Sequence, residues 1–243
     1  MKTLTPKLAR ELGRRGHQRP SLLMPCSTTG RVLRVESRLE RLIALALDVD
    51  PRVTSIAAQP FTIRLDTAKI YEPQELARTS VSDLPIEMRK GLVYTPDFWL
   101  ELVGGAHVIV ECKPKDKTQE LSADLERIRS VLEGMGLRFL VITEEHVGYP
   151  SLEGNLIRIR DAQNRFRMRA GCFDFSWIET LTESAVQISL GEVLAVSDHE
   201  TMLAAIATGV IAVDLRAGPL SKWTPATRSY GDLSHLQILD LEH

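Results

Sequence analysis

One stretch, residues 97–113, constrains the fold of this chain more than any other part of the sequence. Apolar side chains alternate before Gly104 and Gly105, and β-branched residues follow this strong turn signal. The pattern predicts two antiparallel strands joined as a β-hairpin. A tight hairpin brings the start of its first strand beside the end of its second, so Asp97 is expected to lie close to Glu111. The two expected strands are Asp97–Val103 and His107–Cys112.

The second strand carries an acid and an amine in the order Glu111, Cys112, Lys113. Because side chains alternate along a strand, Glu111 and Lys113 share one face and Cys112 points to the other. Two neighbouring carboxylates repel each other unless a cation lies between them, and their oxygens are the ligands that Mg²⁺ prefers. Water bound to such a cation becomes a better nucleophile, which Lys113 can orient or help to deprotonate. This chemistry is that of phosphodiester hydrolysis.

A third acid is expected from an amphipathic helix over Ser37–Asp48, where apolar residues recur at helical spacing. Two residues are candidates, Glu36 and Glu40. Glu40 lies at the edge of the apolar stripe, whereas Glu36 precedes the expected cap, Ser37. The run from Ser37 to Glu40 also has the form of a capping box, in which Glu40 only satisfies an N–H group at the helix start. Spacing favours neither role of Glu40 over the other.

The expected order of elements is helix, strand, strand, strand, helix, strand. Its second helix is Lys117–Gly134, with Thr118 as a possible cap, and its last strand is Leu137–Thr143. This order, with Pro96-Asp97 and the Glu111-Cys112-Lys113 run, resembles that of the PD-(D/E)xK nuclease superfamily. The resemblance implies an α/β fold with a restriction-endonuclease-like core, a central mixed sheet flanked by helices.

The C-terminal part changes in composition after Gly171. Short helices are expected at Leu190–Val196 and His199–Ala207, followed by a helix-ending Gly209 and a strand over Val210–Leu215. Two helices and a strand suit a small winged-helix-like domain. Upstream, Arg158–Arg169 is expected to form a basic hairpin. The predicted organisation is a basic arm at 1–35, the nuclease domain at 36–169 and the winged-helix-like, partner-interaction domain at 170–243.

Charge is distributed unevenly, although the formal net charge is only −2. Residues 1–35 contain eight Lys or Arg against Glu11 alone, and residues 170–243 contain ten Asp or Glu against three Lys or Arg. Positive charge attracts phosphate, so the N-terminal arm is a plausible DNA contact, with a solvated tail as the alternative. The acidic part is assigned to protein contacts. Without a signal peptide or an apolar run of membrane-spanning length, the expected location is cytoplasmic.

Further segments resemble a known family. Thr29-Gly30-Arg31-Val32, Ser37-Arg38-Leu39-Glu40 and Gln59 are similar to the start of TnsA-type endonucleases, the cleavage subunits of heteromeric transposases. The resemblance continues through the Thr95-Pro96-Asp97-Phe98, Glu111-Cys112-Lys113-Pro114 and Phe139–Glu144 runs, and weakens after Pro150.

This resemblance implies roles for individual residues. Glu40, Asp97 and Glu111 would ligate Mg²⁺ or Mn²⁺ together with the backbone carbonyl of Cys112, and Lys113 would be the catalytic lysine. The choice between Glu36 and Glu40 falls on Glu40. The TnsA pattern has Gln at the position of Glu111, and a glutamate there strengthens metal binding.

The resemblance also implies a function. The chain would cleave the 5′ strands of double-stranded DNA at transposon ends, beside an RNase H-like transposase subunit and an ATP-dependent transposition regulator. Two alternatives remain: a stand-alone nuclease of restriction, repair or phage type, and a catalytically silent DNA-binding scaffold subunit. The complete set of Glu40, Asp97, Glu111 and Lys113 argues against the silent subunit. A transposase gene beside this one would favour the transposon enzyme over the stand-alone nuclease.

Overall fold

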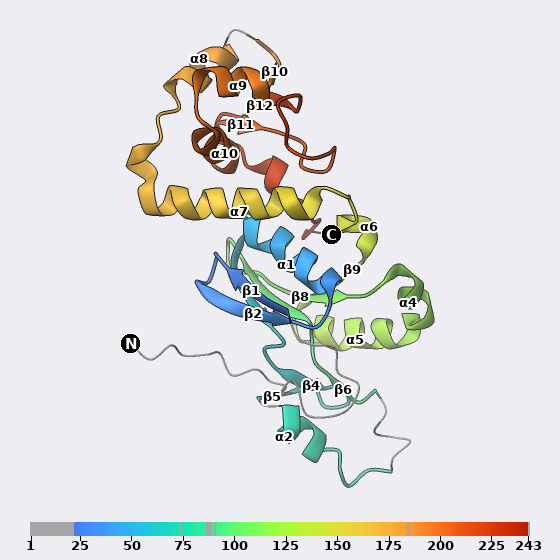
Figure 1. Ribbon diagram of the computed structural model, residues 1–243. Helices are drawn as coiled ribbons and strands as arrows, with labels where there is room; N and C mark the ends of the chain where they lie inside the picture. Colours follow the sequence, from blue (N-terminus) through green and yellow to red (C-terminus); the bar gives the residue numbers. More distant parts are fainter. Residues whose placement is uncertain (1–21, 73, 86–88, 90, 184, 243) are drawn as a thin grey trace. The chain divides into compact units, whose positions relative to one another are not determined.

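A computed structural model describes residues 22–72, 74–85, 89, 91–183 and 185–242 of the 243-residue chain (Figure 1). These residues divide into two compact units. The first contains 22–43, most of Val53–His146 and the chain end from Leu241, and the second contains Ala44–Arg52 and the described part of Val147–Asp240. The first 21 residues of the predicted basic arm lie outside the described residues.

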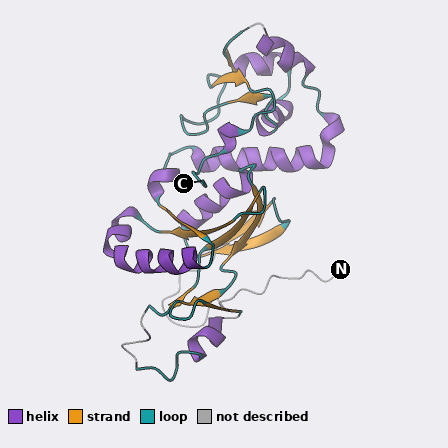
Figure 2. Ribbon diagram, turned by 180° about the vertical axis from the view of Figure 1, so that it is seen from behind, coloured by secondary structure: helices purple, strands orange, loops and turns teal. Residues whose placement is uncertain are grey.

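The first unit is built on a four-stranded mixed sheet, seen among the strands of Figure 2. Its strand order is β3-β7-β8-β9, in which β8 and β9 are parallel and the other pairs are antiparallel. The predicted mixed central sheet is therefore confirmed. The strands are β3 (Val53–Ala58), β7 (Phe98–Leu102), β8 (His107–Cys112) and β9 (Arg138–Ile142).

The predicted hairpin is formed by β7 and β8. Gly104 and Gly105 both have positive φ angles, 91° and 83°, and the backbone N–H of Gly105 donates to the carbonyl of Leu102 at 2.9 Å to close the turn. In the register of the two strands, Phe98 lies opposite Val110. One step further along the hairpin, this register places Asp97 opposite Glu111.

One face of the sheet packs on helix α5 (Ser122–Gly134). Ile109 of β8, Phe139 of β9 and Leu132 of α5 belong to one buried apolar cluster. Leu125 and Ile128 of α5 pack against this cluster. Both faces of β8 are buried from Val108 to Cys112. Residues on the Cys112 face and on the face that carries Glu111 are therefore both buried.

The predicted helix Lys117–Gly134 is two helices, α4 (Lys115–Glu120) and α5, separated at Leu121. No residue of α4 is buried, so packing does not force it into line with α5. Thr118 is not the cap, because its hydroxyl donates to the carbonyl of Lys115, at 2.7 Å, within α4 itself.

The remaining elements of the first unit are small. Helix α1 (Arg38–Val49) confirms the predicted amphipathic helix and runs across the division between the two units.

The described part of the predicted arm contains an unforeseen hairpin of β1 (Leu22–Cys26) and β2 (Arg31–Val35). Helix α2 (Gln74–Thr79) is short. A second small sheet, order β5-β4-β6, and helix α6 complete the unit: β4 (Thr62–Arg64), β5 (Lys69–Tyr71), β6 (Val93–Tyr94) and α6 (Glu144–Val147).

The second unit begins with a long helix, α7 (Leu152–Arg169). The predicted basic hairpin over Arg158–Arg169 is therefore wrong. Leu152, Leu156 and Ile159 are fully buried at helical spacing, and neither Gly nor Pro interrupts the arginine-rich stretch. Helix α7 packs against α10, and both belong to the second compact unit.

The rest of the second unit alternates helices and short strands. The predicted helices Leu190–Val196 and His199–Ala207 are confirmed as α9 and α10. The predicted strand Val210–Leu215 is shorter, with only Ile211–Ala212 paired as β11. A three-stranded sheet has the order β10-β12-β11. The other elements are η1 (Ala170–Cys172), α8 (Ser176–Glu183), β10 (Ile188–Ser189), β12 (Pro225–Arg228) and η2 (Ser234–Leu236). In the described part of the chain, every helix is too short or too polar to cross a bilayer.

Gly209 provides a test of the packing of the second unit. Its φ angle is +76°, and an added Cβ would lie 2.8 Å from the carbonyl oxygen of Asp232. We predict that Gly209→Ala lowers the free energy of unfolding by about 2 kcal/mol or more, because the left-handed backbone and the clash with Asp232 both disfavour a Cβ atom here. Gly218→Ala is the control, because nothing lies within 4 Å of its Cβ position. Equal denaturation midpoints for the two variants would contradict the described packing.

Candidate active site

Two acidic side chains meet at one end of the β7–β8 hairpin. Asp97 immediately precedes β7, and its Oδ2 accepts a hydrogen bond from the backbone N–H of Cys112 at 2.7 Å. Glu111 is only 5% exposed, and its Oε2 accepts a hydrogen bond from the hydroxyl of Tyr94 at 2.8 Å. Lys113 forms an ion pair with Oε1 of Glu111. The predicted neighbourhood of Asp97, Glu111 and Lys113 is therefore present.

Burial and negative charge make the ionised form of Asp97 costly. Burial raises the pKa of Asp97 well above its usual value, and the charges of Glu111 and Glu40 raise it further, whereas Lys113 opposes them. The charges of Glu111 and Glu40 thus oppose the ionisation of Asp97. A cation placed among them would remove this cost.

Lys113 carries the compensating positive charge. Burial acts to lower the pKa of its amine, but Glu111 and Asp97 outweigh this effect, and the pKa of Lys113 is raised. The amine is therefore protonated at neutral pH. With 29% of its side chain exposed, Lys113 can also reach a group that arrives from solvent.

For Glu40, the sequence left two roles open, helix cap and metal ligand. Its Oε1 accepts from the Ser37 hydroxyl at 2.8 Å, and its Oε2 accepts from the backbone N–H of Glu36 at 2.7 Å. The backbone N–H of Glu40 in turn donates to Ser37 Oγ at 3.1 Å. Here Glu40 closes the start of α1, in the manner of a capping box. Its charge nevertheless acts on Asp97, so the two carboxylates belong to one electrostatic cluster.

Two further residues contact this cluster and were not predicted to do so. Tyr94 is buried and holds Glu111 through its hydroxyl, and burial together with the charge of Glu111 raises the pKa of Tyr94 well above its usual value. Gln59 is buried as well, and its backbone N–H donates to the carbonyl of Asp97 at 3.0 Å. In the sequence, the place of Tyr94 three residues before Asp97 could have indicated that it lies in the site. Nothing in the residues around Gln59 indicated a contact with the site.

The donor set can be compared with the needs of a divalent cation. Mg²⁺ commonly takes one or two carboxylates and keeps several waters. Asp97 and Glu111 satisfy this requirement by donor type and charge, and the backbone of Cys112, which follows Glu111, contacts Asp97. Within the described residues, no three His, Cys, Asp or Glu side chains converge in a geometry that could hold a metal ion. Glu40 could act as a third ligand only by leaving Ser37.

The thiol of Cys112 takes no part in this chemistry as a nucleophile. It is buried, and burial together with Asp97 and Glu40 raises its pKa well above the usual value, so the thiol stays protonated. All three cysteines of the chain are free.

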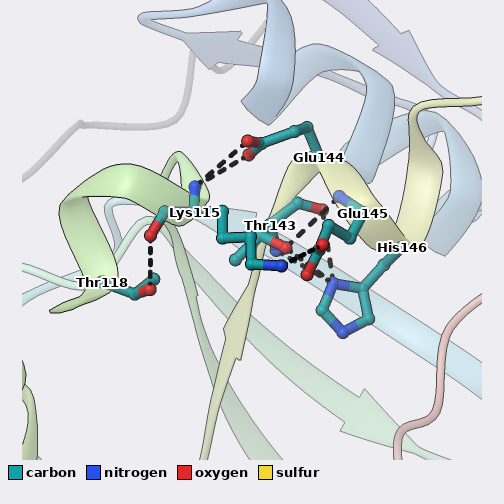
Figure 3. Close-up of polar contacts among 6 residues, drawn as sticks. All are labelled: Lys115, Thr118, Thr143, Glu144, Glu145 and His146. Atoms are coloured by element: carbon teal, nitrogen blue, oxygen red, sulfur yellow. Dashed lines mark hydrogen bonds and ion pairs between the residues drawn. The ribbon is translucent and has the colours of Figure 1, made fainter.

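The chain just beyond Lys113 is anchored to the end of β9 (Figure 3). Both carboxylate oxygens of Glu144 accept from the backbone N–H of Lys115, at 3.2 and 3.0 Å, and the amine of Lys115 pairs with Glu145. The backbone N–H of Thr143 donates to Nδ1 of His146 at 3.1 Å, which shapes the turn that carries both glutamates. This network holds the segment that follows the lysine of the site.

The fold and the site together define a class. A mixed central sheet flanked by helices, with two adjacent acids and a lysine at one hairpin end, is consistent with a nuclease fold. Residues 50–144 match the family model described as "TnsA-like endonuclease N terminal". The resemblance to TnsA-type endonucleases is thereby confirmed at the level of this one domain. The matched segment contains Asp97, Glu111 and Lys113 and begins after Glu40. No curated protein matches the chain.

The raised pKa of Asp97 predicts a stabilising substitution. Asp97→Asn removes the cost of the buried charge and keeps an oxygen for the N–H of Cys112. In EDTA at neutral pH, we expect the free energy of unfolding to rise by on the order of 1 kcal/mol. The gain should vanish as the pH falls through the ordinary range of an aspartate, because the wild-type Asp97 carboxyl is then protonated in both the folded and the unfolded chain.

Asp66→Asn is the control, and we expect it to lower the free energy of unfolding. A hydrogen bond from Arg64 lowers the pKa of Asp66, so the same substitution there removes a favourable contact. Thermal unfolding across pH compares the two variants. A loss of stability in Asp97→Asn at neutral pH would contradict the described charge cluster.

Proposed function

We propose that this chain is a Mg²⁺-dependent DNA endonuclease that hydrolyses a phosphodiester bond at the Asp97–Glu111–Lys113 site. The observation that carries the proposal is the meeting of two carboxylates and a protonated lysine at one end of the hairpin, inside the segment similar to TnsA-like endonucleases. Mn²⁺ is expected to substitute for Mg²⁺, because both accept the same oxygen ligands.

Each residue has a distinct task in this proposal. Asp97, Glu111 and the backbone carbonyl of Cys112 hold the cation. When bound, the cation lowers the pKa of a coordinated water and stabilises negative charge at phosphorus. Lys113, protonated and partly exposed, binds the phosphate and orients the attacking water. Glu40 joins the ligands by turning away from Ser37.

We further propose that the DNA is a transposon end and that the chain cleaves its 5′ strand. This part rests on the similarity of residues 50–144 alone. The partners would be an RNase H-like transposase subunit, which acts on the other strand, and an ATP-dependent transposition regulator.

For the C-terminal part we propose a winged-helix-like domain. The elements α8, β10, α9, α10, β11 and β12 follow one another in the order that such domains have, and the sheet order β10-β12-β11 is also that of a winged helix. Helix α10 would occupy the place of the helix that enters the DNA groove in helix-turn-helix proteins. Its residues Thr201–Ala207 are all buried within the chain, which disfavours base recognition by this helix and leaves any partner contacts to exposed residues elsewhere in the domain.

The test is cleavage of a DNA fragment that carries two transposon ends. With Mg²⁺ and an RNase H-like transposase partner, the wild-type chain should cut the 5′ strands. Asp97→Ala and Lys113→Ala should each lower the rate by at least about 100-fold, the cost of removing one group that stabilises the transition state. Lys117→Ala is the matched control, since this lysine pairs with Glu120 on the surface.

Three results would count against the proposal. Cleavage that survives both substitutions would remove the site. Efficient cleavage without a transposase would favour a stand-alone nuclease. Binding of DNA without cleavage under any of these conditions would favour a silent scaffold.

A further inference from the structure

Gln59 combines three features that a core residue rarely has together. It follows β3 with a φ angle of +45°, in the left-handed region that residues other than glycine seldom adopt. It is 5% exposed, so its amide is removed from water. Its Oε1 is buried, and no donor among the described residues reaches it. Each feature costs free energy, and such residues persist only where the surrounding structure holds them.

The contacts of Gln59 explain what holds it. Its backbone N–H donates to the carbonyl of Asp97 at 3.0 Å, next to the carboxylate of the site. Its side-chain Nε2 donates to Oε1 of Glu36 at 3.2 Å. Glu36 in turn donates its backbone N–H to Glu40. One residue thus connects the two chain segments that carry Asp97 and Glu40.

The backbone half of this connection continues the β3–β7 ladder, because the register pairs Ala58 with Phe98 and places Gln59 opposite Asp97. The side chain of Gln59 adds the link to Glu36, which no pairing of the described strands supplies. Glu40 stands at the start of a helix, and Asp97 directly precedes β7. Gln59 ends β3 in a left-handed conformation, with its backbone N–H bonded to Asp97 and its side chain bonded to Glu36.

We propose that Gln59 is a positioning residue that holds the Glu36–Glu40 segment beside Asp97, so that Glu40 lies within reach of the cation held by Asp97 and Glu111. The proposal rests on the proposed function for its effect on cation binding. Its structural half, the restraint on the start of α1, does not depend on that function.

The first test is hydrogen exchange without any divalent cation. Gln59→Met keeps the length of the side chain and the backbone contact but removes the donor to Glu36. We expect faster amide exchange over residues 36–41 in this variant. Gln119→Met, on the exposed surface of α4, is the matched control and should leave that exchange unchanged. Unchanged exchange in Gln59→Met would overturn the proposal, whatever the chain does with cations.

The second test is Mn²⁺ binding, followed by the electron paramagnetic resonance signal of the free ion. Loss of a residue that orients a metal ligand weakens metal binding by about 10- to 100-fold, and we expect a weakening in this range for Gln59→Met. Glu36→Met should have a similar effect, and the double variant should be little worse than either single one, because the same contact is lost.

The outcomes separate the two proposals. Wild-type Mn²⁺ affinity in Gln59→Met, with only the unfolding midpoint lowered, would mean that Gln59 stabilises the fold and does not position the site. A wild-type chain that binds no Mn²⁺ would instead contradict the proposed function, while the exchange experiment would still decide whether Gln59 restrains Glu36–Glu40. Fully additive losses in Gln59→Met and Glu36→Met would show that their contact is not the cause.

Discussion

The hydrogen bond from the backbone N–H of Cys112 to the carboxylate of Asp97 is the interaction on which the site depends. It fixes the register at the open end of the hairpin, and with it the distance between Asp97 and Glu111. A slip of one residue would turn every side chain of β8 to the opposite face and separate Glu111 from its partners. The turn at Gly104 and Gly105 enforces the same register from the other end.

Local patterns were enough to predict the hairpin, the helix α1 and the acids and lysine that meet on one face. These features follow from side-chain alternation, from glycine in a tight turn and from helical spacing of apolar residues. The helix α7 was mistaken for a hairpin because its arginines hide the buried stripe of Leu152, Leu156 and Ile159. The break at Leu121 was missed because the sequence does not show that α4 buries nothing.

The contacts of Tyr94, Gln59 and Glu40 show where sequence reasoning ends. Tyr94 reaches Glu111 and Gln59 reaches Glu36 across distances along the chain that no local pattern spans. For Glu40 the pattern named both roles, cap and ligand, and the structure displays the cap. A carboxylate has only two oxygens, so the choice between the roles depends on which donors or cations are nearby, and this is a property of the folded site.

The burial of α10 has a practical consequence. A helix whose side chains from Thr201 to Ala207 are all enclosed offers no variable surface to a partner of any kind. Substitutions there will alter how much folded protein a cell accumulates before they alter what the protein selects. Screens for altered target choice should therefore draw their libraries from exposed positions elsewhere, and treat a phenotype in this helix as a matter of abundance.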